Sequence, residues 1–597
     1  MNNTYTAISI GPIFKTFAEV KKSRELWGAS YLFSYITREI IEQLKAKDMQ
    51  RILPFYPDLP DEIDDLGAGF FADRIIYEGD LKNEIEHIKN EVFGKLSTGS
   101  GINSKLSTKS EINSELSTKS EIDDKDQHNL PKKYLENYIR IAVITFTLPV
   151  ELEATKKEKN IVLVANKLLD SAELQEKYYQ DITDIDWRAA IDNLNREIFY
   201  KKAFKSSTNF LFPSLLEIGT DDFRKINKEH YQSLKKILYE EPNNSKDQNK
   251  QDSENQENFM QKRLIIENMQ SKDSENQKNF ILALKKDEQF KSLTFRPYHK
   301  YVAVVEADGD NIGETIKAIG ENADQIRSFS EALFNFSKAA TEKIIGYGGK
   351  PVYSGGDDLL FFAPVASMVD EAGNVMPTQK SIFGLLKEID DVFTRNIVEN
   401  EKLKDLYKKD NDGNSKVKKP SLSFGISVSY YRFPLNESRD TAHCLLRKAK
   451  EGNKNKICFE LRKHSGHSFP VTIDKSKSES YKHFLDLMSI IPLDKELLTS
   501  LIFKLRINHL LLNQIANNKN RLFIFFNQEF DVDLNNPKNS KETFIKEVVD
   551  YYCRLAMDFP KDNVPLPEKE TEADTSNIGK LFSTLQFMKH LIDESDE

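Results

Sequence analysis

The sequence Ser-Gly-Gly-Asp-Asp at residues 354–358 lies between two short apolar runs, residues 351–353 and 359–362. Two such runs joined by a tight glycine turn predict a β-hairpin with the acids at its tip. Upstream, the apolar run at residues 300–305 leads into Ala-Asp-Gly-Asp at residues 307–310. An acid at the end of a neighbouring strand completes a set of oxygen ligands for a divalent cation.

The segments around this hairpin are predicted in the order strand, helix, hairpin, helix, strand. The first helix is indicated from Ile326 onward by apolar residues every three or four positions, namely Phe329, Leu333, Phe336, Ala340 and Ile344. Gly346, Gly348 and Gly349 end it. A second helix is expected over residues 382–398, and the alternation over residues 421–429 predicts a half-buried strand with one face of small residues. This order is that of a nucleotidyl-transferring Palm domain.

Three carboxylates are the predicted catalytic and metal-binding residues: Asp308, Asp357 and Asp358. Mg²⁺ or Mn²⁺ takes oxygen ligands, and two such ions can activate an attacking 3′-hydroxyl and neutralise the leaving oxygens of a triphosphate. The alternative is a purely structural turn, because Gly and Asp both tolerate positive φ. The accompanying acids and the strand and helix order favour a metal and nucleotide site.

Further residues are predicted to bind the nucleotide. The turn after the first strand would offer backbone groups to metal and triphosphate at the start of a helix, through Gly309, Asp310, Asn311, Ile312 and Gly313. The hairpin turn adds Ser354, Gly355 and Gly356, and the small strand face would place Ser423 and Ser427 beneath the base. Lys450 is a candidate phosphate ligand, and an ordinary exposed helix lysine is the equal alternative.

These motifs resemble a known family. The segment Ala-Asp-Gly-Asp-Asn-Ile-Gly at residues 307–313, the hairpin, and Ser-Phe-Gly-Ile-Ser-Val-Ser at residues 423–429 followed by Pro434-Leu435 look like the second Palm domain of the large subunit of type III CRISPR effector complexes, the Cas ten family. The N-terminal part resembles the first, non-catalytic Palm of the Cmr (III-B) branch, through Ile-Ser-Ile-Gly-Pro at residues 8–12, Phe17, Ala18, Lys22, Arg24, Leu26 and Trp-Gly-Ala-Ser-Tyr-Leu at residues 27–32.

The resemblance implies the signalling subunit of an RNA-guided antiviral complex, activated by target RNA. Its substrate would be ATP, converted with Mg²⁺ or Mn²⁺ into a cyclic oligoadenylate, and its partners would be other Cmr-type subunits, guide RNA and complementary target RNA. An alternative product joins AMP to S-adenosylmethionine as co-substrate. Two other classes stay open, a free-standing GGDEF-like nucleotide cyclase and a catalytically idle scaffold.

Two features common in the family are not expected here. No His-Asp dipeptide occurs among the 10 histidines, so an HD nuclease domain is not predicted. The 3 cysteines, Cys444, Cys458 and Cys553, form no Cys-x-x-Cys pair, so no structural zinc is predicted.

Composition bounds the class of protein. The net charge of −9 gives no overall nucleic-acid signature, so RNA contacts would come from local patches or from partners. No leader-like start and no run approaching about 18 apolar residues occurs, which predicts a cytoplasmic protein away from membranes.

The predicted fold class is α+β, with two ferredoxin-like Palm domains, a helical region between them and a C-terminal helical domain. The predicted domains are residues 1–155 with an insertion at about 96–125, then 156–294, 295–470 and 471–597. The insertion contains three Leu-Ser-Thr repeats, beginning at Leu96, Leu106 and Leu116, and should be a polar surface arm. Residues 243–258 are predicted to be disordered. Leucines at helical spacing in residues 497–512 favour core packing over partner docking.

Overall fold

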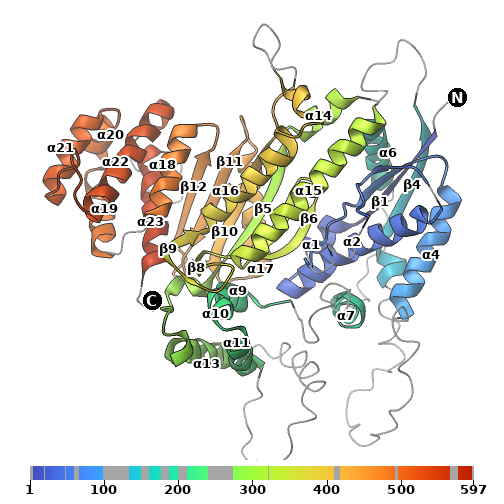
Figure 1. Ribbon diagram of the computed structural model, residues 1–597, viewed down its shortest axis with the longest axis horizontal. Coiled ribbons are helices and arrows are strands. Elements are labelled where there is room, and N and C mark those ends of the chain that lie inside the picture. The colour runs from blue at the N-terminus through green and yellow to red at the C-terminus, as the bar shows by residue number, and fades with distance from the viewer. Residues whose placement is uncertain are drawn as a thin grey trace, which may run out of the picture.

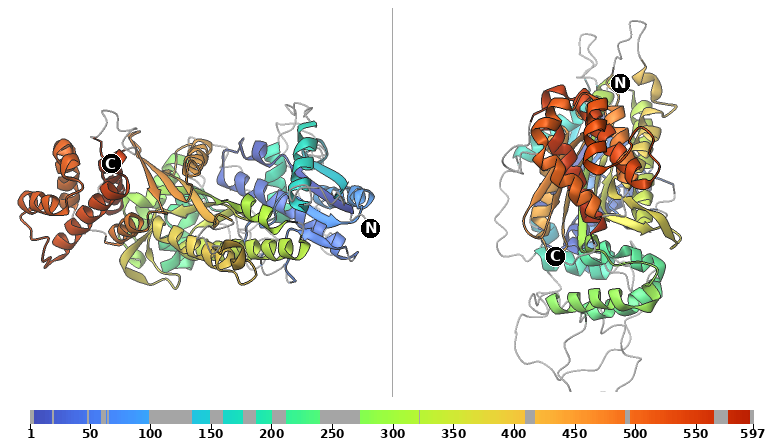
Figure 2. Two further views of the ribbon diagram at one scale, coloured as in Figure 1. Left: turned by 90° about the horizontal axis from the view of Figure 1, so that it is seen from above. Right: turned by 90° about the vertical axis from the view of Figure 1, so that its left-hand side faces the viewer.

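The computed structural model describes residues 4–18, 20–47, 49–58, 63, 66–98, 134–148, 160–175, 187–199, 212–239, 273–320, 322–408, 417–490, 495–564 and 576–593. The molecule is elongated: one sheet and its helices form one end, a larger sheet lies in the middle, and the C-terminal helices form the other end (Figure 1). The same arrangement is seen from above in Figure 2.

The N-terminal domain contains a four-stranded antiparallel sheet in the order β2-β3-β1-β4. Its strands are β1 (Thr4–Gly11), β2 (Arg51–Leu53), β3 (Arg74–Glu78) and β4 (Arg140–Thr147), and its helices are α1 (Ile13–Ala18), α2 (Ser23–Lys45) and α4 (Lys82–Thr98). The chain order β1-α2-β2-β3-α4-β4 is the ferredoxin-like pattern.

The central sheet has six strands in the order β12-β11-β10-β5-β7-β6. The strands are β5 (Tyr301–Asp310), β6 (Lys350–Gly355), β7 (Asp358–Pro364), β10 (Ser421–Tyr430), β11 (Lys456–Arg462) and β12 (Ser468–Asp474). With α15 (Ala323–Tyr347) and α16 (Ile382–Phe393), the first four of these repeat the topology of the N-terminal domain. The predicted α+β fold with two Palm domains is confirmed.

Most of the helices and strands predicted around the hairpin are confirmed. α15 begins where the Asn322 side chain accepts hydrogen bonds from the backbone N–H groups of Asp324 and Gln325, and it ends at Gly348 with φ of 108°. β5 runs five residues beyond the predicted strand, to Asp310. The second helix changes to a π turn at residues Thr394–Val398, within its predicted range.

The central sheet is covered on both faces. α15 and α16 share one hydrophobic core with Val305 and Ala307 of β5, while α17 (Leu435–Ala449) packs on the other face of β10. Gly425 allows that close approach, because a Cβ there would lie 2.2 Å from the Ala442 carbonyl oxygen.

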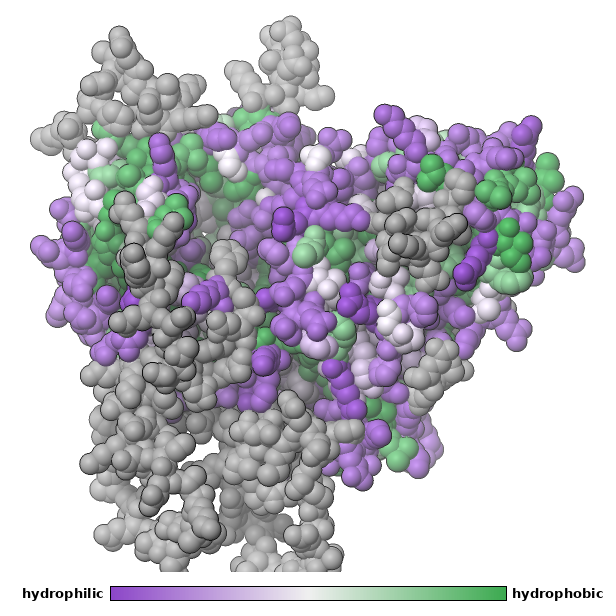
Figure 3. Space-filling view, turned by 180° about the vertical axis from the view of Figure 1, so that it is seen from behind, coloured by the Kyte–Doolittle hydropathy of each residue, from purple (hydrophilic) through white to green (hydrophobic). Residues whose placement is uncertain are grey.

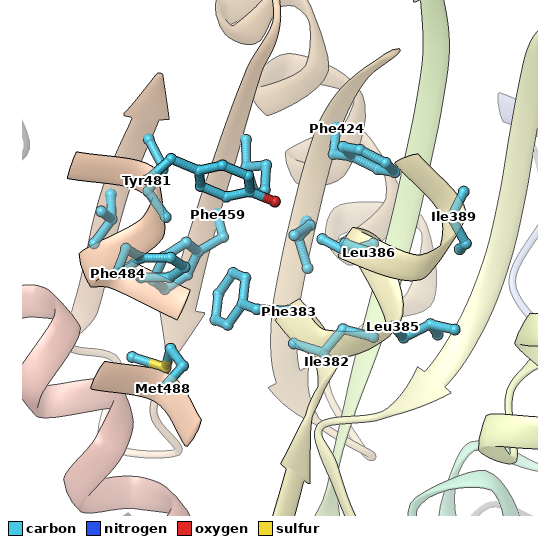
Figure 4. Packing of buried hydrophobic residues seen from close by; sticks show 14 of the residues in the cluster. Ile382, Phe383, Leu385, Leu386, Ile389, Phe424, Phe459, Tyr481, Phe484 and Met488 are labelled. Carbon is cyan, nitrogen blue, oxygen red and sulfur yellow. The ribbon is translucent and has the colours of Figure 1, made fainter. Parts of the chain in front are cut away.

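Helices after the central sheet extend its core. Phe383 of α16 packs against both Phe459 of β11 and Phe484 of α18, at centroid distances of 4.8 and 5.0 Å (Figure 4). The C-terminal helices are α18 (Ser478–Ser489), α19 (Lys495–Ile507), α20 (His509–Ile515), α21 (Lys519–Phe530), α22 (Ser540–Asp558) and α23 (Asn577–Ile592).

The remaining regular segments lie between or beside the two Palm domains. They are α6 (Ile161–Gln175), α7 (Trp187–Leu194), α9 (Leu215–Gly219), α10 (Asp221–Ile226), α11 (Lys228–Lys235), α13 (Asp273–Lys286), α14 (Ile312–Ile319) and the hairpin of β8 (Ala366–Val369) and β9 (Val375–Ser381). Short 3₁₀ or π turns are η1 (Asn195–Phe199), η2 (Lys236–Tyr239), η3 (Glu288–Phe290), η4 (Pro297–Lys300), η6 (Lys404–Tyr407) and η7 (Pro560–Asp562). Among the described residues, no helix combines the length and apolar character needed to cross a bilayer.

The predicted start of the insertion is wrong. Leu96 lies in α4 with 2% of its surface exposed and packs into the core of the N-terminal domain, so the first repeat begins inside a structural helix. The later repeats and the polar stretch at residues 243–258 lie outside the described residues.

The leucine-rich C-terminal segment packs into the core, and apolar side chains are also exposed beside it. Core packing is confirmed for the buried leucines Leu497, Leu498, Leu501, Leu505 and Leu512. Figure 3 shows hydrophobic surface at this end of the molecule. The exposed apolar residues are Phe503 and Ile507 of α19, Leu510 and Leu511 of α20, and Ile524 of α21.

Candidate active site

Three carboxylates converge at one edge of the central sheet. Asp308 is near the end of β5, Asp357 is in the turn between β6 and β7, and Asp358 begins β7. Because β5 and β7 are antiparallel neighbours with Ala307 opposite Leu359, the ends that carry the acids are adjacent. One oxygen from each carboxylate lies within 4.8 Å of the others, which suits a shared divalent cation.

Glycines make this convergence possible. A Cβ on Gly309 would lie 2.6 Å from Asp357 Oδ2, so a side chain there would clash with this acid. Gly356 has φ of +68°, in the left-handed region that glycine adopts at little cost. The site therefore fits a cation bound by carboxylate oxygens beside the glycine backbone of Gly309 and Gly356.

Two serines fix the hairpin turn against α15. The Ser337 hydroxyl donates to the Gly356 carbonyl oxygen at 2.8 Å, and the Ser354 hydroxyl donates to the Ser337 carbonyl oxygen at 3.1 Å. Ser354 is buried, so it supports the turn from within, while the acids project from the other side.

The acids raise one another's affinity for protons. Burial, and then the charge of Asp308, raises the pKa of Asp357 to about 7. The pKa of Asp358 is also raised, by the surrounding protein and by Asp357 and Asp308, although its side chain reaches solvent. Near neutral pH the metal-free cluster therefore retains a proton that a bound cation would displace.

Two lysines approach the cluster from the loop that follows α17. Lys450 Nζ forms an ion pair with Asp308 and donates to the Gly309 carbonyl oxygen at 3.2 Å. Lys454 Nζ lies 3.5 Å from Asn311 Oδ1. Lys450 is thus the partly buried C-cap residue of α17 and pairs with an acid of the cluster, and its role as a phosphate ligand stays a prediction. Lys454 was missed, and its only signal was its position one helical turn after Lys450 in a lysine-rich stretch.

The turn after β5 leads directly into a helix, as predicted. Asn311 adopts φ of 62° and is the N-cap residue of α14, whose first residues are Ile312 and Gly313. Gly313 is exposed, so this end of α14 is open to an anion beside the acids.

Besides Ser354, three predicted site residues are turned into the protein. Asp310 is 1% exposed, and its Oδ2 accepts from Ser421 Oγ and Ser423 Oγ, each at 2.7 Å. Ser427 Oγ is hydrogen-bonded to Ser438 Oγ of α17 at 3.1 Å. The expected open floor beneath a base is therefore wrong at Ser423 and Ser427, because α17 covers that face of β10.

A cavity lies beside the acids, between the two Palm domains. Its volume is about 270 Å³, and Asp357 and Asp358 form part of its wall. The remaining wall comes from both domains and is mostly apolar, with Phe55, Phe70, Asp73, Arg74, Asn166, Ile316, Ile319, Phe329 and Leu333 among its residues. Sequence reasoning missed this surface because its parts are far apart in the chain.

The N-terminal domain also supports the hairpin of β6 and β7. Gly69 pairs with Tyr353 as a parallel bridge beside β6, and the Ser354 N–H donates to the Gly69 carbonyl oxygen at 2.9 Å. Ser30 Oγ donates to the Val352 carbonyl oxygen at the same distance of 2.9 Å. The otherwise free edge of the central sheet is thus closed by the other domain.

Comparison with known proteins gives two matches to domain families. The family model described as "Cas10/Cmr2, second palm domain" matches residues 301–458, and "CRISPR-associated protein Cmr2, N-terminal" matches residues 5–162. The first match contains all three acids and both lysines. No curated protein sequence matches the chain.

Solved structures give weaker likenesses. A type III-B Cmr-beta complex bound to cognate target RNA has a chain with 13% identity and a TM-score of 0.41, covering 79% of this chain and 71% of that chain. A Csm1–Csm4 cassette in complex with cA4 has 12% identity and a TM-score of 0.42, covering 99% and 70%. Csm1 from T. onnurineus has 11% identity and a TM-score of 0.39, with coverage of 99% and 70%.

Proposed function

Because this chain belongs to the Cas10/Cmr2 family of type III CRISPR effector subunits, we propose that its second Palm domain transfers adenylyl groups from ATP. The observation that carries the proposal is the cluster of Asp308, Asp357 and Asp358 at the wall of a cavity between the two Palm domains. A family member that served only as a scaffold would not need three carboxylates with oxygens within 4.8 Å of one another, since adjacent carboxylates repel one another.

The reaction joins the 3′-hydroxyl of one nucleotide to the α-phosphorus of an ATP, and pyrophosphate leaves. Asp308, Asp357 and Asp358 would hold Mg²⁺ or Mn²⁺, which supplies activation of the hydroxyl and neutralisation of the leaving oxygens when bound. Lys450 and Lys454 would take the triphosphate, with the first backbone N–H groups of α14. These groups stabilise charge that grows during the transfer, which is where electrostatic catalysis acts.

The adenine base would lie in the interdomain cavity, in place of the expected position on Ser423 and Ser427. The volume of this cavity, about 270 Å³, is close to the lower end of the usual range of ligand-pocket volumes, about 300 Å³. Apolar side chains from α14 and α15 can stack on a base, and Asp73, Arg74 and Asn166 offer hydrogen bonds to its edge or to the ribose.

The product and its control are part of the proposal. A cyclic oligoadenylate requires repeated 3′-transfer from ATP alone, whereas an AMP conjugate would require S-adenosylmethionine. We propose the oligoadenylate, made in a complex with other Cmr-type subunits and guide RNA, and switched on by complementary target RNA. The exposed apolar side chains of α19, α20 and α21 provide surface on which such subunits could pack.

The test is to incubate the assembled complex, guide and matching RNA with labelled ATP, with and without S-adenosylmethionine, and to identify products by mass spectrometry. Asp357→Ala with Asp358→Ala should abolish synthesis and leave assembly intact. Glu401→Ala with Asp405→Ala is the matched control, since it removes two exposed carboxylates of the same domain that pair with surface lysines. Near-normal synthesis by the first double variant would refute the assignment of the acids.

A further inference from the structure

The loop between α17 and β11 has an unusual backbone. Gly452, Lys454 and Asn455 all have positive φ, at 66°, 58° and 55°. Glycine adopts this region freely and asparagine tolerates it, but a lysine there is uncommon. Such a conformation persists only where surrounding contacts hold it.

Asp310 supplies the contacts that hold this loop. Its Oδ2 accepts the Asn455 N–H at 2.9 Å, in addition to the hydroxyls of Ser421 and Ser423, each at 2.7 Å. From the other side, the Lys475 N–H donates to the Asn455 carbonyl oxygen at 3.0 Å. Asn455 is therefore fixed at both of its backbone polar groups.

The held loop adjoins one lysine of the candidate site and contains the other. Lys450, the C-cap residue of α17, lies two residues before the loop and reaches Asp308, while Lys454 lies within it and reaches Asn311 at the start of α14. Asp310 itself lies outside the group of carboxylates whose oxygens come within 4.8 Å of one another. Asp310 is also buried, so its carboxylate does not reach the solvent-exposed surface of the turn after β5.

We propose that Asp310 is a positioning residue: it holds the loop of residues 452–455 in its left-handed form, and so aims Lys450 and Lys454 at the triphosphate. This role rests on the proposed function. It differs from metal ligation, the role that an acid two residues after Asp308 would suggest.

A carboxylate suits this role better than an amide. One charged oxygen accepts three donors here, and charge-assisted hydrogen bonds are the stronger kind. An asparagine would keep one acceptor oxygen for these donors, but a neutral one, and its NH2 group would take the place of Oδ1, which is buried without a hydrogen-bond partner. The Asp310→Asn variant should therefore loosen the loop without leaving a cavity.

The variants are Asp310→Asn, Asp310→Ala, Asn455→Gly and the combination of Asp310→Ala with Asn455→Gly, each in the assembled, RNA-activated complex. Loss of charge-assisted bonds should raise KM for ATP by roughly tenfold or more in both single Asp310 variants. The Mg²⁺ concentration for half-maximal rate should stay unchanged. Asn455→Gly should restore much of the affinity in the Asp310→Ala background, because glycine needs no help to adopt positive φ.

Asp370→Ala is the control. That carboxylate also accepts backbone N–H groups, from Ala372 and Asn374, but it does so in the β8–β9 turn away from the acids. It should leave KM unchanged. Hydrogen exchange of residues 451–456 should become faster in both Asp310 variants and stay at the wild-type rate in Asp370→Ala.

The outcomes separate three cases. An unchanged KM and an unchanged loop exchange rate in Asp310→Asn would overturn the inference, as would a raised Mg²⁺ requirement that Asn455→Gly does not rescue. If the wild-type complex neither binds a non-cleavable ATP analogue nor makes product, the proposed function fails, and the exchange measurement still decides whether Asp310 holds the loop. If Asp310→Ala does not fold, Asp310→Asn carries the comparison.

Discussion

Lys450 Nζ forms an ion pair with Asp308, so the ammonium group at the end of α17 neutralises the charge of Asp308 in the metal-free site. The two side chains are 27% and 33% exposed, which leaves room for a ligand to separate them. A cation bound to Asp308 would compete with this lysine, and a triphosphate would take it as a partner.

Lys450→Met should therefore affect the two ligands in opposite directions. ATP binding should weaken by roughly tenfold through loss of a charge-assisted bond, while Mn²⁺ affinity in the absence of nucleotide should hold or rise. Mn²⁺ titration by electron paramagnetic resonance and binding of a fluorescent ATP analogue measure both. Lys456→Met is the control, because that ammonium bonds to the Glu451 carbonyl oxygen instead. Equal loss of both affinities would show that Lys450 acts only as support.

The bond from Ser337 to Gly356 predicts a second effect. Ser337→Ala removes the donor that fixes the hairpin turn to α15 and should lower the free energy of unfolding by about 1 kcal/mol. Synthesis should fall by more than this stability loss explains, because the turn carries Asp357. Chemical denaturation and initial rates measure the two. Ser489→Ala removes a comparable hydroxyl bond at an exposed position of α18 and should leave the rate unchanged.

The raised pKa of Asp357, about 7, predicts pH dependence of metal binding. In the metal-free folded protein this acid stays protonated above the ordinary aspartate range, so folding stability falls as pH rises toward about 7. A cation displaces that proton, so Mn²⁺ affinity should rise from about pH 6 to about pH 8, and stabilisation by metal should rise with it. Melting temperatures with Mn²⁺ and with chelator measure this. Asp357→Asn should flatten the pH dependence; an unchanged slope in that variant would place the proton elsewhere.

The burial of His299 predicts that folding stability changes with pH in the opposite direction. This residue lies outside the candidate active site. Burial lowers the pKa of His299 to about 3, and its Nδ1 accepts the Arg296 N–H at 2.9 Å. The unfolded chain takes up this proton near pH 6.5, the folded chain only at much lower pH, so stability is lost as pH falls below about 6.5. His299→Asn, which keeps an acceptor, should reduce the slope of unfolding free energy against pH in acid. An unchanged slope would shift the cause to His590, whose pKa burial also lowers to about 3.

Local sequence was sufficient for much of the second Palm domain. Period-two and helical periodicity predicted β10 and α15, and glycines marked the end of α15 and the hairpin turn, because these patterns act within a few residues. The predicted order of strands was by itself enough to place Asp308, Asp357 and Asp358 close together. The first Palm domain was predicted from the resemblance of the N-terminal residues to a known family, and the four-stranded sheet β2-β3-β1-β4 confirms that prediction.

Tertiary structure decided which of these side chains face a ligand. Asp308 and Asp310 share one face of β5, yet Asp308 joins the cluster and Asp310 is buried against Ser421 and Ser423. The difference arises because the backbone of the loop after α17 closes over Asp310, whereas only the Lys450 side chain reaches Asp308. The interdomain cavity and the place of Lys454 depend on segments far apart in the chain. Sequence periodicity reports which residues share a face; only packing determines what covers that face, since long-range contacts leave no local pattern.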